Sequence, residues 1–102
     1  MSRTLAALDF SIDDQTIAAL AKGIAHPVRV QILRLLNSQS CCYTGDLTEQ
    51  IPLAQSTISQ HLKVLKDVGL IQGEIIPPRV KYCLNKDNWK KTQSLFKDLL
   101  EI

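Results

Sequence analysis

Three cysteines are the residues of this chain best suited to covalent or metal chemistry: Cys41, Cys42 and Cys83. Adjacent thiols in a cytosolic chain do not make a disulfide framework. Such thiols bind soft ions such as arsenite, cadmium or cuprous copper, are oxidised reversibly, or pack as small apolar side chains. The sequence leaves these alternatives open, so a soft metal or metalloid ion is a conditional prediction.

A second group of polar side chains lies on one predicted helix, the segment 54–70 with the sequence AQSTISQHLKVLKDVGL. At about 100° per residue, Ile58, Leu62 and Leu65 form an apolar stripe. The opposite side carries hydroxyl, amide and lysine groups, which bond base edges and phosphates in a DNA major groove. An ordinary solvated helix face is the alternative. The candidate DNA-binding residues of this helix are Gln55, Ser56, Thr57, Ser59, Gln60, His61 and Lys63.

A shorter helix precedes this segment. Thr44–Ile51 has Thr44 as its predicted N-cap, and Asp46 stands in the first turn, where an acid complements the positive helix end. Pro52 ends the helix because it lacks an N–H and disfavours helical geometry before it. Helix, short turn and helix predict a helix-turn-helix over about residues 44–68, with the second helix placed for recognition.

Two strand-like runs follow and predict a β-hairpin over about residues 70–84. Pro77-Pro78-Arg79 separates the runs as a short loop. A hairpin after a helix-turn-helix is a wing. Arg79 at its tip and Lys81 on its outer face could bind phosphates or enter a minor groove. Without the neighbouring helix, both would be ordinary surface charges.

Four motifs together resemble the ArsR/SmtB family of regulators. They are AHPVRVQILRLL (25–36), GDL (45–47), QSTISQHLKVL (55–65) and GLI (69–71), and the resemblance extends over about residues 17–84. It implies a winged-helix homodimer that binds an inverted-repeat operator in double-stranded DNA. It further implies repression of an operon and release of the DNA when an inducer binds. Members of the family respond to metals or metalloids, to redox state, or to no known signal.

The chain departs from the metal-binding patterns of that family. Metalloid sensors often carry Cys-x-Cys just before the Asp-Leu pair, and those positions here are Tyr43 and Gly45. Zinc sensors place acids and histidines on the final helix, which contains no histidine here. We therefore transfer neither metal site. A family member without a metal response remains an alternative.

The expected fold class is mainly α with a small β-hairpin wing, a winged helix-turn-helix in the order α-α-α-α-β-β-α. Residues 1–102 should form one domain. A first helix begins at Ser11 or Asp13 and a second at Pro27, and His26 before it is expected to bond the backbone. The second helix should direct three apolar side chains into the core: Val30, Leu33 and Leu36.

The last predicted helix begins at Asn85 or Asp87 and continues through Leu100. Its apolar stripe is too large to be buried against a wing alone. We therefore expect the first and last helices to pack across a twofold axis as a homodimer. The alternative is a stripe that folds back on its own subunit. The apolar residues of this stripe are Trp89, Phe96, Leu99 and Leu100.

The winged-helix interpretation also constrains the cysteines. In such folds the segment before the helix-turn-helix commonly pairs with the wing as a third strand, which would place residues 40–43 beside residues 82–84. Neighbouring residues of a strand point to opposite faces. Because Cys83 is expected on the outer face, only one of Cys41 and Cys42 can join it. Two thiols, not three, should meet within one subunit.

Composition bounds the class of protein. The 102 residues, 45% of them hydrophobic, suffice for one modest domain. The net charge is +2, yet residues 1–50 hold four basic and five acidic residues, whereas residues 51–102 hold eight and five. Positive charge is thus concentrated on the half with the proposed recognition helix and wing. No apolar run could span a bilayer, and residues 1–10 lack a signal-peptide pattern, so we expect a cytoplasmic protein without a membrane partner.

No motif of the sequence indicates catalysis. It contains no nucleophile elbow, phosphate-binding glycine loop, paired carboxylates in an apolar setting or metal-ligand spacing. We therefore predict no catalytic residue and no enzymatic activity. The stronger competitor to DNA binding is a winged helix that binds a protein partner instead.

Overall fold

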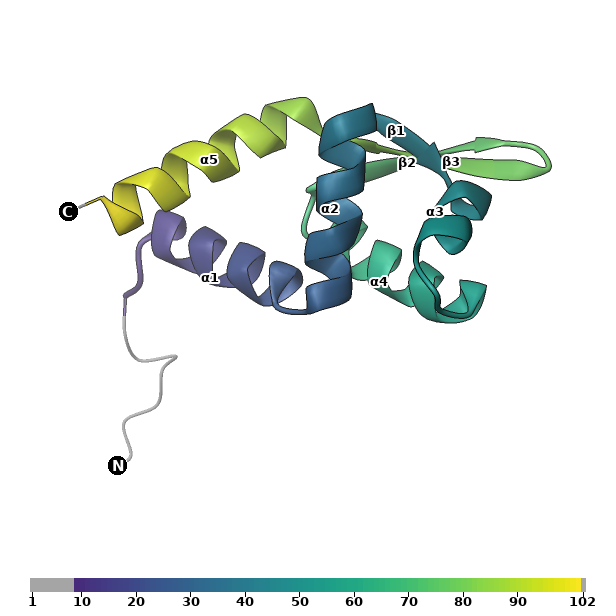
Figure 1. Cartoon of the computed structure of the whole chain (residues 1–102). Coiled ribbons are helices and arrows are strands. Elements are labelled where there is room, and N and C mark those ends of the chain that lie inside the picture. Colours follow the sequence, from purple (N-terminus) through teal and green to yellow (C-terminus); the bar gives the residue numbers. More distant parts are fainter. Residues whose placement is uncertain (1–8, 102) are drawn as a thin grey trace.

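The computed structural model describes residues 9–101 and has the predicted fold class (Figure 1). Helices pack against one end of a small sheet whose hairpin projects away from them (Figure 1), and the expected third strand precedes the helix-turn-helix. Residues 1–8, which carry most of the segment assessed for a signal peptide, lie outside the described part. Within that part, no helix is long and apolar enough to cross a membrane. The elements are α1 (Ile12–Ile24), α2 (Pro27–Gln39), β1 (Cys41–Tyr43), α3 (Thr44–Gln50), α4 (Gln55–Asp67), β2 (Ile71–Ile76), β3 (Arg79–Leu84) and α5 (Lys86–Leu100).

The first two helices begin where the sequence predicts. The Oγ atom of Ser11 accepts a hydrogen bond from the N–H of Asp14 at 3.0 Å, which satisfies one free donor of the first turn. Pro27 is the first residue of α2, where its missing N–H costs nothing. His26 caps this helix, because its Nδ1 atom accepts the N–H of Val28 at 3.1 Å. The expected bond of His26 to the backbone is confirmed.

The start of α3 corrects one prediction. Thr44, expected as the N-cap, is the first helical residue, and Tyr43 occupies the cap position. The carboxylate of Asp46 accepts the N–H of Tyr43 at 3.4 Å, so the acid of the first turn holds the chain at this position. At the other end of the chain, Asn85 caps α5 by accepting the N–H of Asn88 at 3.2 Å.

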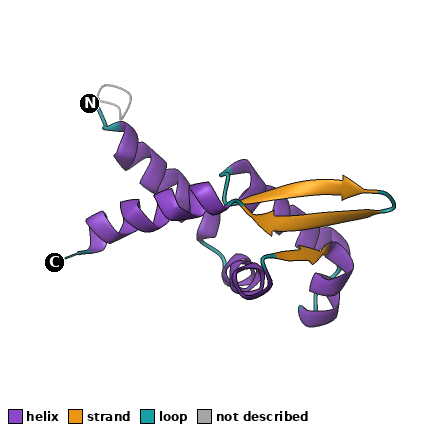
Figure 2. Ribbon diagram, turned by 90° about the horizontal axis from the view of Figure 1, so that it is seen from above, coloured by secondary structure: helices purple, strands orange, loops and turns teal. Residues whose placement is uncertain are grey.

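The sheet is antiparallel with the order β1-β3-β2, so β3 is the middle strand (Figure 2). Its residue Cys83 lies opposite Cys41 on one side and opposite Gln72 on the other. The hairpin of β2 and β3 turns at Pro77-Pro78 and forms the wing. Gly69, with φ +82°, adopts the left-handed conformation that glycine favours and turns the chain from α4 towards β2.

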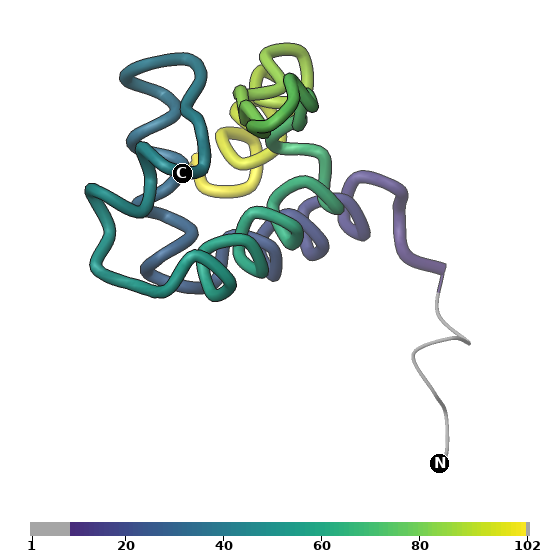
Figure 3. The backbone as a smooth tube through the Cα atoms, turned by 90° about the vertical axis from the view of Figure 1, so that its right-hand side faces the viewer, coloured from purple at the N-terminus to yellow at the C-terminus, as the bar shows by residue number. Residues whose placement is uncertain are grey.

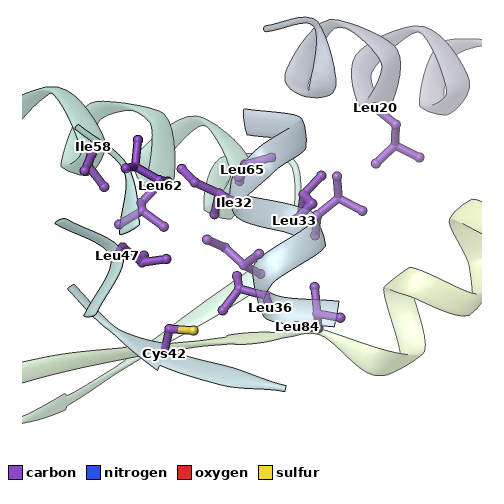
Figure 4. Packing of buried hydrophobic residues seen from close by; sticks show 13 residues of the cluster. Leu20, Ile32, Leu33, Leu36, Cys42, Leu47, Ile58, Leu62, Leu65 and Leu84 are labelled. Atoms are coloured by element: carbon purple, nitrogen blue, oxygen red, sulfur yellow. The ribbon is translucent and has the colours of Figure 1, made fainter. Parts of the chain in front are cut away.

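The core is formed mainly by α2, α3, α4 and the sheet (Figure 4). The predicted stripe of α4 is fully buried, and Leu47 and Ile51 of the preceding segment are buried as expected. Val30, however, is 36% exposed, which corrects its predicted place in the core. Ile32 is fully buried instead. At about 100° per residue Val30 lies outside the arc that Ile32, Leu33 and Leu36 share.

The molecule is elongated, with principal dimensions of 50 × 30 × 23 Å. Helices α1 and α5 lie at one end and the tip of the wing at the other (Figure 1). Helix α4 runs along one long side, next to α1 and α2 (Figure 3). The wing tip is therefore well separated from the start of α1 and the end of α5 (Figure 1).

Candidate nucleic-acid interface and cysteine pair

Helix α4 presents the polar face that the sequence predicts. Its apolar stripe is anchored in the core, so the opposite side points to solvent. Ala54 caps this helix without a side-chain hydrogen bond, as its methyl group requires. Gln55, Ser56, Ser59, Gln60 and Lys63 are exposed, whereas Thr57 and His61 on the flank are half-buried. None of these seven side chains is covered completely by the protein's own residues.

One side chain of this face already has an ionic partner. The Nζ atom of Lys63 lies 2.9 Å from a carboxylate oxygen of Asp67, one turn further along α4. The two side chains are 75% and 60% exposed. Exposed ion pairs contribute only about 0–1 kcal/mol. A phosphate could therefore replace Asp67 as the partner of Lys63 at little cost.

The flank of α4 packs against His26 and lies near Arg29 at the start of α2. The rings of His61 and His26 are tilted with their centroids 4.4 Å apart. The pKa of His61 is lowered, first by burial and then by the charges of His26 and Arg29. Arg29 also has a buried Nε atom without a hydrogen-bond acceptor. Sequence reasoning did not bring Arg29 into this site, because α2 and α4 are joined only by tertiary packing.

The wing carries the two predicted cations. The guanidinium of Arg79 lies over the ring of Tyr43 at 4.4 Å, a cation–π contact between the wing tip and the start of α3. Lys81 lies 3.8 Å from Glu74 on the neighbouring strand. Sequence reasoning missed Ile75 next to the tip, whose 76% exposure gives the wing an apolar edge. Ile75 is followed by a second isoleucine, so apolar–polar alternation did not predict which face of the sheet its side chain would occupy.

The cysteines meet as a pair, as the sequence predicts. Cys41 and Cys83 are directly opposite on β1 and β3 and are joined in a disulfide bond. The choice left open between Cys41 and Cys42 is thus decided. The bond agrees with reversible oxidation, one of the alternatives that the sequence leaves open. The N–H of Leu84 donates to the carbonyl of Ser40 at 3.2 Å, so the next pair, 41 and 83, is a non-hydrogen-bonded pair, where side chains approach most closely.

Cys42 points to the opposite face and is 3% exposed in the core. Its Sγ atom lies 3.2 Å from Oε1 of Gln39. Burial raises the pKa of its thiol, and the charge of Asp46 raises it further. A protonated, buried thiol is a poor nucleophile and a poor metal ligand. Of the three predicted sensor residues, Cys42 is therefore the one that packs.

No cluster for a metal ion is present in residues 9–101. Three or more histidine, cysteine, aspartate or glutamate side chains do not come together anywhere in that range. Both sulfurs of the Cys41–Cys83 pair are used by their mutual bond. The directly opposite positions of Cys41 and Cys83 on β1 and β3 suit oxidation and reduction of their thiols.

A helix-turn-helix with an exposed polar second helix, followed by a hairpin, defines the chain as a winged-helix protein. The model of the family described as bacterial regulatory protein, arsR family, matches residues 26–72. The HTH-type transcriptional regulator YgaV of Escherichia coli is 36% identical over 70 residues, which cover 69% of this chain and 71% of YgaV. The chain belongs to the arsR family and is a transcriptional regulator.

Further comparisons agree with this assignment. The HTH-type transcriptional repressor SmtB of Mycobacterium tuberculosis is 39% identical over 66 residues, which cover 64% of this chain and 47% of SmtB. Among solved structures, HlyU from Vibrio cholerae superimposes with a TM-score of 0.73 at 28% identity, covering 89% of this chain and 98% of that one. The reduced form of HlyU gives a TM-score of 0.70 at 29% identity, covering 88% and 94%.

Proposed function

We propose that this protein is a homodimeric repressor that binds an inverted-repeat operator. The exposed polar face of α4, held outward by a buried apolar stripe, carries the proposal. In this arrangement α4 enters the major groove, and its hydroxyl and amide groups contact base edges. Arg79 and Lys81 of the wing contact the adjacent backbone or minor groove. DNA binding of this kind also places the protein in the cytoplasm.

Arg29 beside α4 supports the same orientation. Its charge lies near the imidazole rings of His61 and His26 on the flank of the helix. Phosphates line both walls of a major groove, so a helix in the groove brings its flanks close to them.

The far end of the molecule supports the dimer. Helix α5 has no fully buried residue, and Leu99 and Leu100 are 58% and 69% exposed. Ile12 at the start of α1 is 80% exposed. A second copy packed on this end would cover these side chains around a twofold axis. It would also hold two α4 helices about 34 Å apart, the spacing of successive major grooves.

The test of DNA binding uses two α4 substitutions and fluorescence anisotropy with the protein's own promoter DNA. Gln60→Ala should weaken specific binding by about 1–3 kcal/mol, because an amide contact to a base edge is lost. Lys63→Ala should weaken binding to all sequences and reduce the salt slope by about one.

Arg34→Ala is the matched control, since Arg34 is an exposed cation on the side of α2 away from the core. Arg34→Ala removes one positive charge, as Lys63→Ala does, but leaves α4 intact. It should change neither the affinity for DNA nor the salt slope. If Gln60→Ala and Lys63→Ala also leave affinity and salt dependence unchanged, the winged helix serves to bind a protein partner.

We further propose that an oxidant is the inducer and that it acts on Cys41 and Cys83. With hydrogen peroxide, one thiolate attacks a peroxide oxygen and becomes a sulfenic acid; the O–O bond breaks, and the hydroxide that leaves takes up a proton from solvent to give the first water. The second thiol then condenses with the sulfenic acid, which forms the S–S bond and releases a second water. HlyU, a structural relative, is described in a reduced form.

The position of the disulfide links the redox state of the two cysteines to the DNA-binding surface. Strand β1 continues directly into α3, whereas β3 belongs to the wing. A covalent bond between them ties the wing to the helix-turn-helix and restricts how the hairpin follows a groove. We therefore expect oxidised protein to bind its operator about tenfold more weakly, within the usual range of coupling free energies.

The same anisotropy assay tests the redox response, with reduced and oxidised protein compared. Cys41→Ser and Cys83→Ser should each abolish the difference, and Cys42→Ala is the control that should keep it. Arsenite, cadmium and zinc are titrated onto reduced protein in parallel. Release by one of these ions that disappears in Cys41→Ser would replace the oxidant with a soft metal or metalloid as the inducer.

A further inference from the structure

A cavity of about 400 Å³ lies beside the disulfide, at the base of the wing. Four elements meet there: the start of β1, the start of β2, the end of β3 and the first turn of α5. The volume is in the range of sites for small ligands. The lining residues are Ser40, Cys41, Gln72, Cys83, Leu84, Asn85, Lys86 and Asp87.

Both disulfide-bonded cysteines belong to the wall of this cavity and are half-buried. A small molecule in the cavity therefore lies next to both cysteines of the disulfide. Cys42 is not in the wall, because it points into the core on the other face of the sheet. The cavity thus gives access to one redox pair and not to the third thiol.

The walls are held in place by backbone hydrogen bonds. The N–H of Leu84 donates to the carbonyl of Ser40 at 3.2 Å, and the N–H of Asn85 donates to the carbonyl of Leu70 at 3.0 Å. These bonds join β3 to the chain before β1 and to the chain before β2. Opening the disulfide would therefore leave the cavity largely formed, as a site for repeated reaction requires.

The electrostatics of the cavity favour an anion. Lys86 belongs to the cavity wall, and α5, a helix of 15 residues, begins at this lysine. The first amide groups of a helix carry a partial positive charge. Asp87 offsets the full charge of Lys86, so the preference for an anion rests on the helix terminus and should be moderate.

We propose that this cavity is a binding site for small anionic thiols, which reduce the Cys41–Cys83 disulfide there. A bound thiolate attacks one of the two sulfurs; the S–S bond breaks, a mixed disulfide forms, and the other cysteine leaves as a thiolate. A second thiolate attacks the mixed disulfide and releases the second cysteine. Two small thiols are thereby oxidised to one disulfide, and their two protons end on the two cysteines.

The inference deepens the proposed function, since it supplies the reaction that restores the reduced, operator-binding state after oxidation. It identifies the reductant by its chemistry: a molecule small enough for the cavity, with a thiol and a carboxylate or sulfonate. The site is defined by the disulfide and α5, not by α4. Its test therefore does not depend on DNA binding.

The test measures how fast three small thiols of different charge reduce the oxidised full-length protein. The probes are 2-mercaptoethanesulfonate (anionic), 2-mercaptoethanol (neutral) and cysteamine (cationic). Each rate is normalised to the thiolate concentration and to the rate with an unstructured peptide disulfide. The anionic thiol should react about fivefold faster than the cationic one, as a helix-terminus interaction predicts. Mass spectrometry should detect a mixed disulfide at Cys41 or Cys83.

Substitutions at the cavity separate this site from general accessibility. Lys86→Gln should abolish most of the preference, Lys86→Arg should retain it, and Asp87→Asn should increase it. Lys90→Gln removes a cation one turn further along α5, outside the cavity wall, and should change nothing. Equal normalised rates for the three thiols, or a preference unaffected by Lys86→Gln, would overturn the proposal. Loss of operator binding alone would overturn the proposed function and leave this site in place.

Discussion

The two ends of the molecule differ in how far their apolar side chains are buried. At the helix-turn-helix end, Leu47, Ile58 and Leu62 are completely buried within a single subunit. At the other end, α5 has no fully buried residue, although Trp89 and Phe96 pack against the rim of the core. One end buries its apolar side chains within the subunit, whereas the other leaves apolar side chains exposed. Substitutions at the two ends should therefore affect different properties.

The largest expected effect is on the stability of the fold, at the helix-turn-helix end. Leu62→Ala should lower the free energy of unfolding by about 2–5 kcal/mol, because it removes a fully buried side chain and leaves a cavity. Urea denaturation followed by circular dichroism measures this change. Val30→Ala is the control: its side chain is 36% exposed, so the loss should be much smaller. Equal losses would mean that Val30 packs in the core after all.

The next largest effect is expected on the proposed dimer, at the end formed by α1 and α5. Leu99→Glu combined with Leu100→Glu should change the stability of the monomer by at most about 0.5 kcal/mol, since both side chains are exposed. Sedimentation velocity should nevertheless show loss of the dimer. Operator affinity should fall at least about tenfold, because the two half-sites are no longer bound by one linked molecule.

Lys97→Glu is the control for the added negative charge on α5. It should leave the dimer and the operator affinity unchanged. Lys97 is an exposed residue of the same helix but is not part of its apolar stripe. Persistence of the dimer in the double variant would show that these leucines are ordinary surface residues of a single subunit.

The smallest expected effect is on the pH dependence of stability, through His61 on the flank of α4. The pKa of His61 is lowered from its ordinary value of 6.5, first by burial, so the folded chain binds this proton more weakly than the unfolded chain does. The stability due to neutral His61 is complete above about pH 6.5 and is lost as the pH falls through the lower folded pKa. Unfolding experiments between about pH 5 and 8 should show this loss in the native protein and not in His61→Asn.

Much of the fold was predictable because its signals are local. Ser11, Pro27, Asn85 and Gly69 act through their own backbone or that of residues a few positions away, so their roles as helix starts and as a turn follow from type and position. The polar face of α4 was equally predictable, since helical spacing alone separates it from its buried stripe. The wing followed from two strand-like runs around Pro77-Pro78.

The cysteine pair shows where local information ends. Strand alternation determined that only one of Cys41 and Cys42 could meet Cys83, and it could not determine which. The register of β1 on β3 decided for Cys41, over a separation of 42 residues in the chain. The same limit explains Val30, because which arc of α2 faces inward depends on how the whole core packs.

By itself, the sequence determined the helix-turn-helix, the wing and the outward chemistry of α4, since helix and strand periods relate residues that are close in the chain. Only the tertiary structure decided what meets across long separations: the disulfide, the contact of His26 with His61, and the cavity at the start of α5. Such meetings depend on the packing of many side chains at once, and no short segment of the chain contains that information.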